Sequence, residues 1–437
     1  MATQPSRATA YGWFVVAVLT LVDVVASIDR YMMGVILVPL KTDLSLTDTQ
    51  LALVYGVGFA LLYCLAGVPI GWFAGRVHRK GCLIAACVMW TAATLLCAFA
   101  ATFEQLFLMR FGVGLGEAAL VPLAISLIGA YIPRQQLGTA NGLFFAGATI
   151  GKALSFIGGG FALTVIAAAG GLAIAGHVFK PWQALFLLAA LPGIVATVLL
   201  LTIREPARRG PAAPSEPEAK ADTGAFLAHF RAHLRTYVLL IGGSCGLHMS
   251  AASVAAWVVS LYVREHGMSL ESAATAAGLI GLVGGVVGAL VGGVVVDALI
   301  RRGVRGAPVL FIAGTLLIGA PMAYVAFTGT ESLAISLAAY VVFHTANLAG
   351  GPQTFAAVQH VTPLPFRGFM SAILLATITL LSLTVGPLLI GILSDVGGSQ
   401  GGLGRAMAIS VVFQNVVGAA LLLTARNSFD RTSRSMN

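Results

Sequence analysis

Hydrophobic residues fall into runs that are too long and too continuous for the core of a water-soluble protein. Each run has about 20 or more mostly apolar residues, the length that an α-helix needs to cross a bilayer. Six runs precede residue 204, at 13–38, 50–75, 81–101, 106–131, 138–166 and 181–203. Six follow residue 235, at 236–263, 272–299, 307–328, 331–357, 366–394 and 403–425. The pattern predicts an all-α membrane protein with twelve transmembrane helices.

A polar segment separates the two sets of six runs. Residues 204–235 are rich in Pro, Ala, Glu and basic residues and contain no run long enough to span a bilayer. We expect an N-terminal six-helix bundle over residues 1–203 and a C-terminal bundle with a short cytoplasmic tail over residues 236–437. A cytoplasmic linker over residues 204–235 joins them, with a short surface helix at about 224–234.

The placement of charge sets the expected topology. The 25 Lys and Arg residues give the chain a net charge of +9, which by itself suggests a nucleic-acid ligand. Most of them, however, fall in the termini, the linker and every second loop, the distribution that marks cytoplasmic loops. The exceptions are four residues in the opposite loops and three within the runs: Lys41, Lys180, Arg264, Arg405, Arg30, Arg110 and Lys152. Both termini are thus expected in the cytoplasm, nucleic acid is excluded as a partner, and the short loops suggest a bacterial inner membrane.

Composition limits the possible chemistry. Of all residues, 58% are hydrophobic and 9% are charged, against about 25% charged in soluble proteins. The 5 cysteines lie in apolar runs without metal-ligand spacing. The sequence has no phosphate-binding loop, zinc-protease motif or nucleophile elbow, so we expect no enzyme activity, no cofactor and no metal. Transport would then depend on an ion gradient or on the substrate alone.

Charged side chains inside the runs are the candidate functional residues, because each costs roughly 2.5–3.5 kcal/mol near a bilayer centre. Arg110 and Glu117 are seven residues apart, so they share one helix face at about 10 Å along the axis. That separation is too long for a direct bond, and Asp29 of the first run, water or substrate must bridge it. Asp29 lies about 100° around its helix from Arg30, which shares a face with Asp23.

These positions suggest a proton-coupling device. We expect Asp29 and Glu117 to take up and release protons, and Arg110 to be the partner whose contacts switch between them. The alternative is a static lattice of ion pairs that holds the first and fourth helices together. Arg30 is either a substrate ligand or a structural residue.

Other polar residues extend the candidate site. Lys152 lies in the middle of the fifth run, where it either attracts an anionic head group or reaches an interface. His344 and Asn347 share a face of the tenth run and either line the pocket opposite Arg110 or form hydrogen bonds between helices. The Gly386-Pro387 pair in the eleventh run predicts a kink or hinge.

An internal repeat relates the two halves. The second run ends in Gly71 to Lys80 and the eighth in Gly293 to Arg302, each with a small residue, a short turn and paired cations. Features that recur six runs apart imply two pseudo-symmetric six-helix bundles with a site between them near the membrane midplane. With the basic linker, this organisation resembles the major facilitator superfamily over nearly the whole chain and implies its fold.

Two local patterns add to this resemblance. Gly71 to Lys80 resembles the superfamily's signature between helices 2 and 3, although Gly75 stands where the signature has Asp. Asp297 keeps the equivalent position in the second half. Arg110 to Glu117 resembles the Arg and glycine ladder of the fourth helix. The resemblance implies gating by Arg76, Arg79, Asp297 and Arg301, beside the Gly386-Pro387 hinge.

The segments Ile28 to Tyr31 and Leu46 to Leu51 resemble the Spinster branch of that superfamily. This branch includes transporters of sphingosine-1-phosphate and lysophospholipids. The resemblance implies that the residues tied to proton coupling are Asp29, Arg110 and Glu117.

We therefore expect a proton-coupled transporter that works by alternating access on an amphipathic, lipid-like substrate. The lipid head group would lie near Arg110 and Lys152, and the protein would act as a monomer in the bilayer. Two alternatives stay open: a proton symporter of a small organic anion, such as a sugar acid or carboxylate, and a membrane receptor without transport activity.

Overall fold

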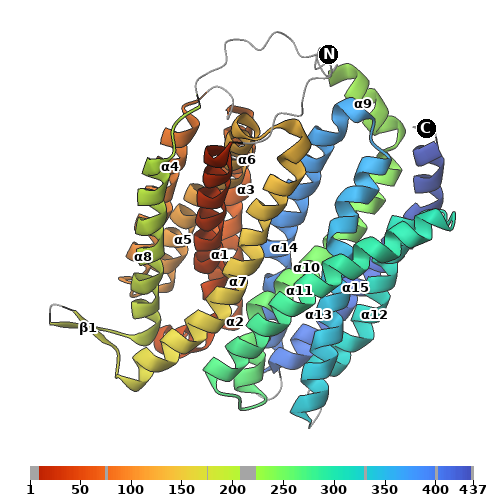
Figure 1. Ribbon diagram of the computed structural model, residues 1–437. Coiled ribbons are helices and arrows are strands. Elements are labelled where there is room, and N and C mark those ends of the chain that lie inside the picture. The colour runs from red at the N-terminus through yellow and green to blue at the C-terminus, as the bar shows by residue number, and fades with distance from the viewer. Residues whose placement is uncertain are drawn as a thin grey trace. The chain divides into compact units, whose positions relative to one another are not determined.

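The computed structural model describes residues 9–73, 77–174, 176–206, 223–328, 332–398 and 402–434. In these residues the chain is almost wholly helical (Figure 1). Within these ranges, twelve helical segments are long and apolar enough to cross a membrane, which confirms the predicted class and number of spans. The side of the membrane on which the termini lie stays a prediction.

The elements follow one another in the order that the runs predicted, with short irregular pieces between them. Before the linker they are α1 (Ala10–Leu44), α2 (Asp48–Ala52), the π-helical turn η1 (Leu53–Val57), α3 (Gly58–Phe73), α4 (Arg79–Cys97), α5 (Phe103–Glu117), α6 (Leu120–Tyr131), the 3-10 turn η2 (Arg134–Gln136), α7 (Leu137–Ala168), β1 (Leu172–Ile174), β2 (His177–Phe179) and α8 (Pro181–Thr202). After it come α9 (Thr223–Ala232), α10 (Leu234–Arg264), α11 (Leu270–Arg301), α12 (Ala307–Phe327), α13 (Leu333–His360), the 3-10 turn η3 (Leu364–Phe366), α14 (Arg367–Gly397) and α15 (Gly402–Arg434).

The chain divides into two compact units. Unit 1 consists of Met1–Ala207 and Val258–Leu282, and unit 2 of Arg208–Trp257 and Val283–Asn437. The last turns of α10 and the first 13 of the 32 residues of α11 therefore belong to unit 1. The predicted division into two bundles joined by a linker at 204–235 stays a prediction.

Three local features differ from the simple pattern of runs. The second predicted span begins with α2, whose N-terminus has a capping box between Thr47 and Gln50, and then passes through η1 into α3. The fourth span is divided between Glu117 and Leu120 into α5 and α6. An antiparallel hairpin, β1–β2, follows α7. Its strands have three residues each, too few for a pattern to reveal. The predicted surface helix of the linker is present as α9.

In unit 1, α1 packs mainly against α7 and α8 (Figure 1). A Cβ atom added at Gly151 of α7 would lie 2.4 Å from the carbonyl oxygen of Val24 in α1, so the two backbones touch there. Gly114 of α5 has the same role against α3, since a Cβ would lie 2.1 Å from the carbonyl oxygen of Phe59. Close approach through small residues is typical of membrane helices. At these two glycines α7 packs closely on α1, and α5 packs closely on α3.

In unit 2, α12 packs against α13 and α15, and α14 against α15. The linker helix α9 is fastened to this unit by Phe226, whose ring contacts Phe366 and Phe369 at centroid distances of 5.4 and 4.9 Å. Burial of its aromatic face explains why a ten-residue helix is ordered here, since such short helices are marginal alone.

Candidate functional site

Two ion pairs connect α1 to α5 inside unit 1. The Arg30 guanidinium donates from Nη2 to Oε2 of Glu117 at 2.5 Å and from Nε to the same oxygen at 3.2 Å. Nη1 of Arg110 donates to Oδ1 of Asp29 at 3.4 Å. Neighbouring residues of α1 thus bind two residues that lie two turns apart on α5. Arg110 and Glu117 are too far apart to bind each other, and the structure gives each of them its own partner on α1.

The Asp29 carboxylate has a second partner on a third helix. Thr94 of α4 donates its hydroxyl hydrogen to Oδ2 of Asp29. Asp29 is therefore held from both sides, by Arg110 of α5 and by Thr94. Nothing in the spacing of the third run singled out Thr94, which is one of several buried threonines and serines in the protein.

Aromatic rings of α3 support both guanidinium groups. The Cζ atom of Arg30 lies 4.9 Å from the ring centroid of Phe59 and 5.1 Å from that of Tyr63. The Cζ atom of Arg110 lies 5.5 Å from the same Phe59 ring. Contacts of this kind contribute up to about 2 kcal/mol when the cation is desolvated. The sequence pattern did not single out Phe59 and Tyr63, although they are four residues apart and therefore lie on one helix face.

Three of the four charged residues of this cluster are buried, and the cluster is incompletely satisfied; Arg30 is the exception, with a side chain that is 20% exposed. Arg110 and Glu117 have no exposed surface, and Asp29 is 3% exposed. In the part of the chain that the structure describes, Oε1 of Glu117 and the Nε and Nη2 atoms of Arg110 are buried without a hydrogen-bond partner. Buried polar atoms without partners cost about 1–3 kcal/mol each and more when charged. A rearrangement or a ligand that supplies partners to these atoms would therefore lower the free energy of the cluster.

The arrangement changes one detail of the sequence interpretation. The sequence allows Asp29 to bridge Arg110 and Glu117, but of these two residues only Arg110 binds Asp29 in the part of the chain that the structure describes. Glu117 is bound by Arg30, the residue for which the sequence pattern made the weaker case. A helical wheel shows which residues share a face but not how the helix is rotated against its neighbours, and this rotation decided the pairing.

Lys152 lies near the same cluster but outside its ion pairs. Its Nζ atom is 5.3 Å from the ring centroid of Tyr31 in α1. Among the described residues no carboxylate forms an ion pair with it. The neighbouring Gly151 packs on α1, which fixes the position of Lys152 in unit 1. Tyr31 was another residue that the sequence analysis did not select.

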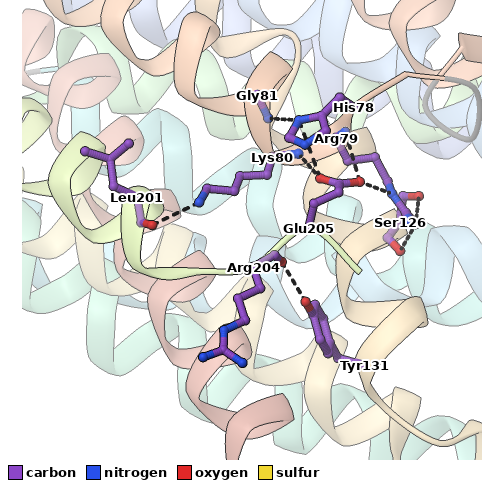
Figure 2. A network of polar contacts seen from close by, with 9 residues as sticks. All are labelled: His78, Arg79, Lys80, Gly81, Ser126, Tyr131, Leu201, Arg204 and Glu205. Atoms are coloured by element: carbon purple, nitrogen blue, oxygen red, sulfur yellow. Dashed lines mark hydrogen bonds and ion pairs between the residues drawn. The ribbon is translucent and has the colours of Figure 1, made fainter. Parts of the chain in front are cut away.

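A second polar network lies where α4 begins and α8 ends (Figure 2). The Glu205 carboxylate accepts hydrogen bonds from the backbone N–H groups of Arg79 and Lys80 at 3.3 and 2.7 Å, and from Nε of Arg79 at 3.3 Å. Lys80 Nζ in turn donates to the carbonyl oxygen of Leu201 near the C-terminus of α8, at 2.9 Å. An anion at a helix N-terminus and a cation at a helix C-terminus are both favourable.

The other side of this network involves α1 and α6. Tyr131 donates its hydroxyl to the Arg204 carbonyl at 2.6 Å, and the Arg204 N–H donates to the Tyr11 hydroxyl at 2.7 Å. Nη1 of Arg79 reaches the carbonyl and hydroxyl oxygens of Ser126, each at 3.3 Å (Figure 2). We call the part of unit 1 around Arg79 and Glu205 the linker end.

The predicted gating residues lie in different surroundings. Arg79 is in the linker-end network, whereas Arg76 and Gly75 lie outside the described residues. Asp297 and Arg301 are exposed near the end of α11, and the described part of the chain has no ion pair between them. Their roles in gating stay predictions.

The predicted residues of the second half lie in unit 2. Asn347 of α13 donates to the carbonyl oxygen of Leu247 and to Oγ of Ser250, at 3.1 and 2.8 Å, as the interhelical alternative expects. His344 is buried and its ring lies 5.5 Å from that of Tyr340.

At the predicted hinge, α14 is a continuous helix through Pro387. A Cβ at Gly386 would lie 2.6 Å from Oγ of Ser253 in α10, and Nε1 of Trp257 donates to the Pro387 carbonyl at 3.1 Å. The pair is therefore a close contact between α14 and α10. Its role as a hinge stays a prediction.

A family model described as the Major Facilitator Superfamily matches residues 19–387. The chain belongs to the Major Facilitator Superfamily. The match covers most of the chain, including both ion pairs between α1 and α5, and it confirms the expected fold.

Known relatives of this superfamily member are transport proteins. An "MFS-type efflux pump" of Mycolicibacterium smegmatis is 27% identical over 415 residues, which cover 93% of this chain and 91% of that protein. A "probable sulfoacetate transporter" of Cupriavidus necator is 30% identical, with 74% and 75% covered. The crystal structure of a bacterial homolog of the human lysosomal transporter Spinster has a TM-score of 0.81 and 24% identity, covering 98% of this chain and 97% of that chain. The protein is thus a multi-pass membrane transporter and not an enzyme, and it resembles the Spinster branch in fold.

Proposed function

We propose that this transporter is a proton-coupled symporter of an organic anion. The observation that carries the proposal is the pair of incompletely satisfied buried charges, Glu117 and Arg110. One can bind a proton and the other can bind an anion. Both lie on the same face of α5, and both are held by α1.

Proton coupling follows from the unequal contacts of Glu117. Among the described residues, only Oε2 of this carboxylate is bound, and its ion-pair partner is Arg30. If a conformational change withdraws Arg30, the buried carboxylate loses its compensating charge and must take up a proton. Return of Arg30 expels the proton. The switchable partner is thus Arg30 for Glu117, whereas Arg110 has this role for Asp29.

Anion binding follows from the free donors of Arg110. Nε and Nη2 are without partners in the described residues, and a guanidinium group presents its donors in a geometry that suits a carboxylate or sulfonate. Lys152 adds a further positive charge near α1. The similarity to the probable sulfoacetate transporter supports a small organic anion as the substrate.

A lipid-like substrate is the second candidate, and one cavity favours it. A pocket of about 570 Å³ lies among α3, α4, α5 and α6, and its lining is almost entirely apolar, including Ile70, Phe73 and Met89. Its lining residue on α5, Leu115, projects roughly 200° around the helix from Glu117. The pocket therefore faces away from the charged cluster, and for that reason we rank the lipid below the organic anion.

The experiment is flux into proteoliposomes with a panel of organic anions and a panel of lysolipids, with and without a pH gradient. We expect an organic anion to accumulate only with the gradient. Glu117→Gln should remove accumulation but keep exchange of the substrate across the membrane. Glu104→Gln is the matched control, because Glu104 is exposed in the first turn of the same helix.

The outcomes separate the candidates. Accumulation of lysolipids alone would replace the organic anion by the lipid. Full proton coupling in the Glu117→Gln variant would remove Glu117 from the mechanism. Saturable binding without any flux would indicate a receptor.

A further inference from the structure

A small cavity lies in unit 1 at the end of α1 that is remote from the linker end. Its volume is about 120 Å³, and its lining includes the aliphatic side chains Leu37, Val38 and Leu51 and the polar side chains Lys41, Ser260 and Arg264. Lys41 is eleven residues beyond Arg30 on α1, or about 16 Å along the helix axis. The cavity is therefore separate from the two ion pairs described above.

Two cations of this cavity share one buried carboxylate. Lys41 Nζ lies 2.5 Å from Oδ1 of Asp48, and Arg264 Nη1 lies 3.0 and 3.1 Å from Oδ1 and Oδ2 of the same residue. The Asp48 side chain is 2% exposed, while those of Lys41 and Arg264 are 32% and 29% exposed. The group thus has more positive than negative charge, and its positive members are the accessible ones.

A second carboxylate at this end of α1 is already engaged. Asp43 binds Lys180 Nζ at 2.5 Å through Oδ1 and Trp182 Nε1 at 2.9 Å through Oδ2. Asp43 is therefore not available to neutralise the excess positive charge of Lys41 and Arg264.

An unused hydroxyl group lies on the wall of the cavity. Ser260 is 1% exposed, and its Oγ atom has no hydrogen-bond partner among the described residues. A buried hydroxyl without a partner costs free energy that a ligand can recover. Arg264 uses only Nη1 for Asp48 in the described part of the chain, so Nε and Nη2 are also available to a ligand.

We propose that this cavity binds the carboxylate or sulfonate group of a small organic anion, with Asp48 as an internal competitor for the two cations. The volume is well below the roughly 300–1,000 Å³ of sites that enclose whole drug-sized ligands, so it suits a head group. The three aliphatic side chains favour an organic anion over an inorganic one. An incoming anion takes donors from Lys41 and Arg264, and Ser260 completes its shell.

Titration calorimetry on the purified full-length protein in a zwitterionic detergent tests this proposal. The probes are methanesulfonate and acetate at constant ionic strength, with dimethyl sulfone as the uncharged analogue. We expect saturable binding of an anion and none of dimethyl sulfone. Arg264→Gln should weaken binding about tenfold, as expected for the loss of a charge-assisted hydrogen bond. Ser260→Ala should weaken it about threefold.

Asp48→Asn gives the sharpest result, because it should tighten binding about tenfold by removing the competitor. Asp43→Asn is its matched control: it removes a carboxylate from a lysine at the same end but outside the cavity, and affinity should not change. If Asp48→Asn does not fold, Val38→Phe fills the cavity without changing its charge and should abolish binding.

Four results would overturn the proposal. One is an equal gain in anion affinity in Asp48→Asn and Asp43→Asn, which would show that only long-range electrostatic attraction of the anion had changed. Another is weaker binding in Asp48→Asn. The third is the absence of saturable binding by either anion. A fourth is binding that Arg264→Gln and Asp48→Asn leave unchanged, which would place the anion at another site, such as Arg110; it would overturn this proposal and leave the proposed symport untouched. Loss of flux in the Glu117→Gln variant leaves this site untouched.

Discussion

Two of the arginine and carboxylate clusters in unit 1, the buried cluster and the linker-end network, differ in how well their atoms are satisfied. In the buried cluster around Asp29 and Glu117, each carboxylate has one arginine, and several atoms have no partner in the described residues. In the linker-end network, the single Glu205 carboxylate receives two backbone N–H groups as well as the Arg79 side chain. Both have the same chemistry, but only the first is poised to change partners.

The difference shows what burial does to an ion pair. Where both partners are buried, as in the Arg110–Asp29 pair, removal of one leaves an uncompensated charge. The Arg79 and Glu205 side chains are 16% and 20% exposed, against 0% and 4% for Arg110 and Asp29, so water can replace a lost partner at the linker end but not at the Arg110–Asp29 pair. Arg30 is itself 20% exposed, so the contrast is with Arg110 and Asp29. We infer that the first cluster governs coupling and that the second fastens α4 to the end of α8.

The largest expected effect comes from removing one arginine from each cluster. Arg110→Ala should lower the free energy of unfolding by about 3–5 kcal/mol, because it leaves Asp29 buried with Thr94 alone. Arg79→Ala should lower it by about 1 kcal/mol or less. Chemical denaturation in mixed micelles measures both. Similar losses in the two variants would show that the clusters do not differ in this way.

A smaller effect should follow from removing the aromatic support, which distinguishes the buried cluster. Phe59→Leu keeps an apolar side chain but removes the ring beside both guanidinium groups, and it should cost about 0.5–2 kcal/mol of unfolding free energy. Phe145→Leu is the control, since Phe145 is exposed at 47% on α7. A double-mutant cycle of Phe59→Leu with Arg30→Gln isolates the interaction. A coupling energy of zero would contradict it.

The smallest effect should be seen at the linker end. Glu205→Gln keeps an acceptor for the N–H groups of α4 but removes the charge, so we expect a loss of about 0.3–1 kcal/mol. Most of this loss should disappear at about 1 M salt, because salt screens partly exposed charges. Denaturation of wild type and variant over a salt series measures it. A loss of unfolding free energy that does not depend on salt would show that Glu205 behaves like a residue of the buried cluster.

The sequence alone revealed which residues carry the chemistry of the buried cluster. Asp29, Arg110 and Glu117 were evident because charges inside an apolar run are expensive and therefore rare. The number of spans followed from the runs in the same way. Small elements were missed, such as the β1–β2 hairpin and the break between α5 and α6, because a few residues contain no detectable period.

Only the tertiary structure decided which of these residues meet. The helical period fixes the relative directions of Asp29 and Arg30 on α1, but the rotation of α1 against α5 pairs Arg30 with Glu117. That rotation depends on contacts such as those at Gly151 and Gly114, where backbones touch. Likewise, no local pattern joins Asp48 to Arg264, which is 216 residues away. Sequence periodicity therefore determines the faces of the helices, whereas close packing between helices determines the partners of the charges.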